Sequence, residues 1–336
     1  MFRASQTTLE RTRTSSTYQK RLQAGLTLFQ SWLCLVALSE TWCTTVELAN
    51  QSLVEFIQHL YNTSQAHYLA RHAILAVEIN WPFLRGKLIR AWQSLKSWKL
   101  QMKSKSRVPI PFLLLQSLVI KALDLGLNGG RFAHYYFCIS VLLRVGFYGL
   151  LRPGELFALR CGHVQLINTK GELVVVLSII KPKTRASFGR SQYVLIRDPP
   201  TVAWVRWLIR DLHSNTKLWP SDGPCFRKVL KAVLSGLNLG ENTITPAGMR
   251  SGGASNLLLL GTDTGTIKHQ GRWASQRSLE VYLQESMALM VLAQLGNKSE
   301  RKLSQLVTVC QDIWQSPFTD PWIKFFKRRQ SCHLKD

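Results

Sequence analysis

The chain has 336 residues, of which 46% are hydrophobic, enough to bury the cores of about two domains. Lys and Arg total 43 against 19 Asp and Glu, so the formal net charge at pH 7 is +24. This composition argues against an intrinsically disordered chain and indicates a polyanionic partner. Charge alone does not distinguish DNA from RNA or from an anionic membrane.

The cysteines and the N-terminal segment indicate the kind of cellular compartment in which the chain is expected. Seven cysteines are scattered without CxxC or paired Cys/His spacing, which predicts a reduced environment and no structural metal. Residues 1–14 form a predicted basic arm without the apolar run of a secretory signal, and an organelle transit peptide is the alternative. The apolar stretch from Tyr135 to Leu151 contains Arg144 and is shorter than the ~20 residues of a membrane helix, so no membrane partner is expected.

Residues 15–105 have a helical pattern and are predicted to form a DNA-binding domain that ends in a basic, proline-flanked linker. If residues 86–103 form one helix, an apolar stripe of Leu88, Leu95 and Met102 lies beside Trp92 and a basic face. An ordinary solvated basic face is the alternative. The candidate DNA contacts are eight basic residues in a stretch without acids: Arg85, Lys87, Arg90, Lys96, Lys99, Lys103, Lys105 and Arg107.

Beyond the linker the pattern predicts a mainly α fold with a small β-hairpin or sheet. Residues 173–180 read as a buried strand by their β-branched content, and residues 192–196 as its antiparallel partner. Gly252 and Gly253 lack side-chain bulk and predict a close approach between backbones. Helices are predicted over residues 112–125, 132–150, from Pro153, from Pro199, 226–237 and 246–261.

Two sequence boxes carry a family resemblance. In the first, Arg152 precedes a predicted helix and Glu155 follows three positions later. In the second, Arg250 is followed by Trp273 at +23 and by Tyr282 at +32. These boxes resemble those of the tyrosine recombinases, or phage integrases, whose late box holds His or Trp nine residues before a nucleophilic tyrosine. The resemblance covers residues 109–285 and also includes Lys183, on the predicted hairpin.

The resemblance implies a role for each residue. Arg152 and Arg250 would neutralise the charge on a DNA phosphate with planar, bidentate guanidiniums. Tyr282 would attack the phosphorus and form a 3′-phosphotyrosyl bond. Lys183 would protonate the leaving 5′-oxygen as general acid, and Trp273 would donate its indole N–H to a phosphate oxygen. No metal, nucleotide or other cofactor is implied.

The sequence departs from the family in one place. Ala247 occupies the position where the family commonly has a histidine three residues before the second arginine, and general acid–base groups contribute about 10²- to 10⁴-fold to rate. Glu155 is expected to orient the site rather than to transfer protons. No catalytic role is expected for His163 or His269.

The resemblance also implies an architecture. A helical core-binding-like domain (15–105) would precede a catalytic domain (109–297) and a C-terminal helix with a basic tail (298–336). Double-stranded DNA is the expected partner, in the nucleus or the nucleoid, with dimers to tetramers assembling on paired sites. The predicted C-terminal helix has an apolar stripe, which favours docking of this helix on a neighbouring copy; docking on the same chain is the alternative. The stripe consists of Leu303, Leu306, Val307, Cys310 and Trp314.

Three functions remain open from sequence. The first is an active site-specific recombinase or integrase of a mobile element. The second is a catalytically impaired DNA-binding relic, which Ala247 favours. The third is a type IB topoisomerase, which shares the Arg, Lys and Tyr chemistry but is disfavoured by the nine-residue interval between Trp273 and Tyr282.

Overall fold

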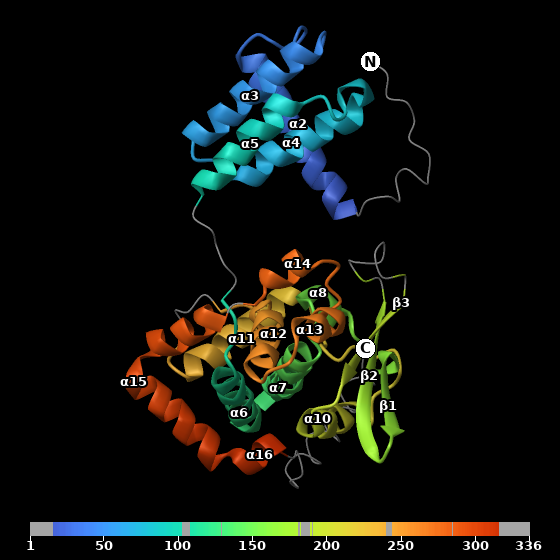
Figure 1. Ribbon diagram of the computed structural model, residues 1–336, viewed down its shortest axis with the longest axis vertical. Coiled ribbons are helices and arrows are strands. Elements are labelled where there is room, and N and C mark those ends of the chain that lie inside the picture. The colour runs from blue at the N-terminus through green and yellow to red at the C-terminus, as the bar shows by residue number, and fades with distance from the viewer. Residues whose placement is uncertain are drawn as a thin grey trace. The chain divides into compact units, whose positions relative to one another are not determined.

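A computed structural model describes residues 16–102, 108–128, 130–180, 182, 189, 191–239, 244–283 and 285–315. Within these ranges the chain is mainly helical with one small antiparallel sheet, which confirms the predicted fold class. The chain divides into two compact units, Met1–Lys105 and Ser106–Asp336, and each is described by itself (Figure 1). No helix in the described ranges is both long and apolar enough to cross a bilayer.

The first unit is helical, with an aromatic core. Phe29 lies at the centre of this core, and its ring centroid is 5.1 Å from those of Trp42 and Phe56. Thr45 accepts a hydrogen bond from the backbone N–H of Leu48, which satisfies one free donor at a helix start. The helices are α2 (Ser16–Leu35), α3 (Val46–Asn62), α4 (His67–Asn80), η1 (Pro82–Leu84) and α5 (Ile89–Gln101).

Helix α5 corresponds to the helix predicted over residues 86–103. Leu88 and Leu95 are buried, as the apolar stripe predicts. Met102 was expected in the same stripe, and this part of the prediction is wrong, because α5 ends at Gln101 and Met102 is 47% exposed. The buried stripe is therefore shorter than its sequence pattern.

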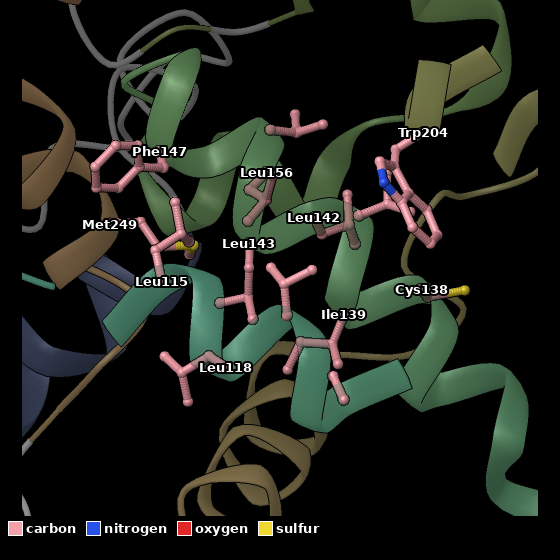
Figure 2. Close-up of a cluster of buried hydrophobic side chains, with 14 of the residues drawn as sticks. Leu115, Leu118, Cys138, Ile139, Leu142, Leu143, Phe147, Leu156, Trp204 and Met249 are labelled. Carbon is pink, nitrogen blue, oxygen red and sulfur yellow. The ribbon is translucent and has the colours of Figure 1, made fainter. Parts of the chain in front are cut away.

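Helices α6 (Phe112–Asn128) and α7 (Ala133–Tyr148) form the centre of the second unit. Leu118 of α6 and Leu143 of α7 lie in one buried cluster, which Figure 2 shows in close-up. Both helices bury most of their residues, as expected for helices that are apolar on nearly all sides. They form the support on which the later helices pack.

The sheet has three antiparallel strands in the order β1-β2-β3. Strands β2 (Glu172–Ile180) and β3 (Ser191–Ile196) pair with Val175 opposite Ile196, which confirms the predicted strand and its partner. Strand β1 (Val164–Thr169) adds a third strand at the edge, which the sequence did not predict. Lys183, expected near the turn between β2 and β3, lies outside the described residues.

The remaining helices bring distant parts of the second unit together. A Cβ on Gly252 would lie 2.0 Å from the carbonyl oxygen of Ile110, and one on Gly253 would lie 2.2 Å from that of Phe147. The predicted close backbone approach is therefore confirmed. These elements are η2 (Gly130–Phe132), α8 (Pro153–Ala158), η3 (Cys161–His163), α10 (Pro199–Ile209), α11 (Gly223–Gly236), α12 (Gly248–Leu259), α13 (Thr264–Gly271) and α14 (Gln276–Glu280).

The C-terminal helices α15 (Glu285–Val309) and α16 (Gln311–Gln315) pack on the core of their own unit. Trp314 is buried there, and the guanidinium carbon of Arg144 lies 3.7 Å from the centroid of its ring. Arg144 Nη1 also donates to the Trp314 carbonyl oxygen at 2.8 Å. The sequence favoured docking on a neighbouring copy, whereas in this chain the helix packs in cis.

Candidate active site

Arg152 and Glu155 meet at the start of α8. Pro153 occupies the first turn, where its missing N–H costs no hydrogen bond. Glu155 Oε2 accepts from the backbone N–H of Arg152 at 3.0 Å, and Arg152 Nη1 donates to Glu155 Oε1 at 2.8 Å. The Arg-Pro-Gly-Glu segment thus both begins a helix and holds the guanidinium of Arg152, whose side chain is 20% exposed.

Arg250 lies in the first turn of α12 and is 1% exposed. Its Nη1 and Nη2 donate to the carbonyl oxygens of Leu150 and Gly271, two segments far apart in sequence. Burial, reinforced by the charges of Arg152 and Arg272, lowers the pKa of Arg250. An arginine guanidinium remains protonated at pH 7 because its ordinary pKa is far above this pH.

The rings of Trp273 and Tyr282 cover the Arg250 guanidinium. Its carbon lies 4.2 Å from the ring centroid of Trp273 and 5.4 Å from that of Tyr282. The two ring centroids are 5.2 Å apart. Trp273 is 3% exposed, whereas Tyr282 is half-buried, and Ser255 Oγ donates to its backbone carbonyl at 3.4 Å.

Arg272 is a site residue that the sequence analysis missed. It is 5% exposed, and its Nη2 donates to Glu155 Oε2 at 2.8 Å, so two guanidiniums hold the two oxygens of Glu155. Burial raises the pKa of Glu155, but the charge of Arg272 and the hydrogen bonds from both arginines outweigh it, and the pKa lies below its ordinary value. The only sequence signal for Arg272 is that it precedes Trp273.

The site contains several buried N–H groups without a partner among the described residues. They are Nε of Arg250, Nε and Nη1 of Arg272, and Nε1 of Trp273. Buried polar groups in proteins are almost always hydrogen-bonded, so a cluster of unpaired donors beside several cations is the arrangement expected of an anion site.

Among the groups of this site, those that could transfer a proton are the least completely described. Ala247, which directly precedes α12, has no group that can transfer a proton. His269 is exposed on α13. Since Lys183 lies outside the described residues, the structure brings together four of the five predicted catalytic residues: Arg152, Arg250, Trp273 and Tyr282.

The predicted DNA contacts of the first unit lie around α5. Lys96 and Lys99 are exposed on that helix. Trp92 is half-buried and donates Nε1–H to Glu78 Oε1 at 3.1 Å, which orients the helix within its own unit. Arg85, Lys87 and Arg90 are exposed as well. Lys103, Lys105 and Arg107 lie outside the described residues.

No family model and no curated protein matches this chain. Solved structures match its fold. The Tn1549 transposon integrase in complex with transposon right end DNA aligns with a TM-score of 0.56 and 12% identity, over 84% of this chain and 95% of that chain. The XerH site-specific recombinase bound to difH substrate, in a pre-cleavage complex, aligns with a TM-score of 0.52 and 12% identity, over 81% of this chain and 78% of that chain.

This chain has a tyrosine recombinase-like fold. A post-cleavage complex of XerH with palindromic difH substrate aligns comparably, with a TM-score of 0.52 and 12% identity, over 78% of this chain and 75% of that chain. At such identity the likeness establishes the tyrosine recombinase-like fold alone. The roles of Arg152, Arg250, Trp273 and Tyr282 therefore depend on their own geometry.

Proposed function

We propose that this chain is a site-specific DNA recombinase that cleaves and rejoins DNA strands through a 3′-phosphotyrosyl bond at Tyr282. The observation that carries the proposal is the stacking of the buried Arg250 guanidinium against the rings of Trp273 and Tyr282. Arg152, about a hundred residues earlier, is close enough to lower the pKa of Arg250. A nucleophile, two phosphate-binding groups and an indole donor are thus available at one place.

The arrangement supports a defined chemical step. The Tyr282 oxygen attacks the phosphorus, the bond from phosphorus to the 5′-oxygen breaks, and the phenol proton is released. Arg152 and Arg250 neutralise the non-bridging oxygens, whose charge grows in the transition state. Nε1–H of Trp273, which has no partner among the described residues, donates to one of them. Attack of the freed 5′-hydroxyl of another strand reverses the step, so the covalent bond conserves the energy for rejoining.

The step involves two proton transfers, one to the departing 5′-oxygen and one from the Tyr282 phenol. Lys183, which follows β2 and precedes β3 in the sequence, supplies the proton to the departing 5′-oxygen as general acid. Ala247 stands where the family commonly has the histidine that accepts the phenol proton, so this proton passes to solvent. Cleavage is therefore expected to be slow relative to a site that has this histidine.

The partner proposed is double-stranded DNA. A net charge of +24 and the exposed basic residues around α5 supply phosphate contacts, which give affinity without sequence selection. The structural neighbours are described as complexes with transposon right end DNA and with difH substrate. Rejoining strands from two sites requires more than one protomer, so we include self-assembly on paired sites in the proposal.

Covalent trapping tests the proposal. The full chain is incubated with nicked, religation-blocked DNA duplexes drawn from the sequence flanking its gene, and protein–DNA adducts are resolved under denaturing conditions. The wild type should form an adduct, and Tyr282→Phe should bind DNA equally but form none. Tyr193→Phe removes an exposed phenol on β3 and serves as the matched control. An adduct that persists in Tyr282→Phe would contradict the assignment of the nucleophile.

Arginine variants separate catalysis from binding. Arg152→Ala and Arg250→Ala should each reduce adduct formation by about 10²-fold or more, because a preorganised donor to the transition state is lost. DNA affinity should change little, since many other cations hold the backbone. Equal losses of binding and cleavage would identify both arginines as binding residues only.

The two alternative functions give different results. A DNA-binding relic would bind DNA with salt-dependent affinity but form no adduct on any flanking duplex, and Ala247 is the observation that favours it. A type IB topoisomerase would relax supercoiled plasmid without sequence preference. Relaxation of plasmids that lack the flanking sequence therefore distinguishes the topoisomerase from the recombinase.

A further inference from the structure

Arg272 is a buried cation with unpaired donors. Only its Nη2 has a partner among the described residues, Glu155, while Nε and Nη1 are buried without one. Its backbone is left-handed, with φ of 58°, although arginine has a Cβ that disfavours this region. Such a conformation persists where the surroundings impose it, and it is frequent at functional sites.

The charges of the site do not balance. Arg152, Arg250 and Arg272 contribute three positive charges, and Glu155 contributes the one carboxylate that pairs with them in the described structure, which leaves a net charge of +2. Burying unpaired cations is costly unless a counter-ion compensates them. Without Arg272, these described residues would leave a net charge of +1.

The additional charge corresponds to the change during the reaction. A phosphodiester carries one negative charge, whereas the five-coordinate phosphorus formed by attack of a phenolate carries two. Among the described residues, each added positive charge favours the more highly charged reacting state over the resting DNA, which is how interactions accelerate a step.

We propose that Arg272 is a third cation of the phosphate site, whose Nη1–H donates to the scissile phosphate while Nη2 remains on Glu155. This inference rests on the proposed function. Nη1 of Arg272 and Nε1 of Trp273 are both buried in the described structure, so the proposal requires neighbouring side chains to move when the anion binds. Arg272 thereby contributes positive charge in a site where Ala247 replaces the family's histidine.

A purely structural role for Arg272 predicts different behaviour. In that case Arg272 only ties Glu155 in place, and Glu155 in turn positions Arg152. Removal of either partner would then lower stability to a similar extent, and neither removal would selectively change the affinity for an anion. Under our proposal the two removals have opposite effects on anion affinity, because one subtracts a positive charge and the other a negative charge.

Sulfate, a dianion at every working pH, is the probe. Thermal unfolding of the full chain is followed in sodium sulfate and in sodium chloride of equal ionic strength, and the sulfate-specific rise in Tm gives an apparent Kd. We expect Arg272→Gln to raise this Kd by at least ~10-fold, since a charge-assisted hydrogen bond is lost. Glu155→Gln should lower it. Arg277→Gln, which removes an exposed arginine of α14, should leave it unchanged and corrects for the general salt effect.

The outcomes decide the role of Arg272. An unchanged sulfate Kd in Arg272→Gln, or an equal loss of sulfate affinity in Glu155→Gln, would overturn the proposal. If Arg272→Gln does not fold, Arg272→Lys is the second variant, because it keeps the positive charge and should keep the sulfate response. A folded Arg272→Lys protein without a sulfate response would also overturn the proposal.

Covalent trapping keeps this inference distinguishable from the proposed function. If wild-type protein forms the DNA adduct while sulfate affinity is independent of Arg272, only the third cation is refuted. If no adduct forms while sulfate affinity depends on Arg272, the anion site stands and strand cleavage does not. If both hold, Arg272→Gln should also slow adduct formation by at least ~10-fold.

Discussion

Replacing Gly271 by alanine tests whether the packing of Trp273 assembles the site. Gly271 is the last residue of α13, and a Cβ there would lie 1.7 Å from Cζ3 of Trp273 and 2.1 Å from its Cε3. The indole cannot yield freely, because it packs against both the Arg250 guanidinium and the Tyr282 ring. Any shift of the indole therefore disturbs both groups.

The magnitude follows from these contacts. Carbon atoms pack at about 3.5–4.0 Å, so the alanine methyl and the indole must separate by roughly 2 Å. Overpacking a core in this way costs about 1–3 kcal/mol. For a unit of this size, 2 kcal/mol corresponds to a fall in Tm of about 4–8 °C. Because displacement by about 1 Å can cost 10²-fold in rate, adduct formation should fall by at least that factor.

The assay is differential scanning calorimetry together with covalent trapping on nicked DNA. Gly154→Ala is the matched control, because it makes the same substitution beside Arg152 and its Cβ would meet no atom within 4 Å. We expect the control to keep wild-type Tm and adduct formation. A Gly271→Ala protein with wild-type Tm would refute the contact with Trp273, and one with a lowered Tm but normal cleavage would refute the role of that packing in catalysis.

Three further results are expected. Trp314→Ala should lower the free energy of unfolding of the second unit, measured in urea, by about 3–5 kcal/mol, because it removes a buried indole that packs against Arg144. A loss below about 1 kcal/mol would indicate that the helix docks elsewhere. Burial raises the pKa of Glu155, but the charge of Arg272 and the hydrogen bonds outweigh burial, so the pKa is lowered in the folded protein. The ionised Glu155 therefore stabilises the fold above the ordinary glutamate pKa of about 4.3, and this stabilisation is lost as the pH falls through the pKa of the folded protein. Glu155→Gln should therefore flatten the acid side of the stability–pH profile, and an unchanged profile would contradict the pairing. Ala247→His should accelerate adduct formation, and an unchanged rate would mean that another group already accepts the phenol proton.

The sequence by itself determined the elements whose signals are local. Proline at the start of α8, the β-branched run of β2 and the paired glycines of α12 each follow from the conformational limits of single residues. Strand β1 was not predicted, because an edge strand is stabilised by its ladder to β2, and half of its residues are polar. Lys183 stays a prediction, since it lies outside the described residues.

The spacing of the motif also indicated which residues would meet, but only the tertiary structure decided how they are held. The apolar stripe predicts that Trp314 is buried but does not specify the surface that buries it. In the structure, Trp314 packs on Arg144 of the same chain. No local sequence pattern marks Arg272 as a site residue, because its partner Glu155 lies 117 residues earlier in the chain. Charge pairing across such an interval depends on the distance between side chains in space, which the order of residues along a chain does not contain.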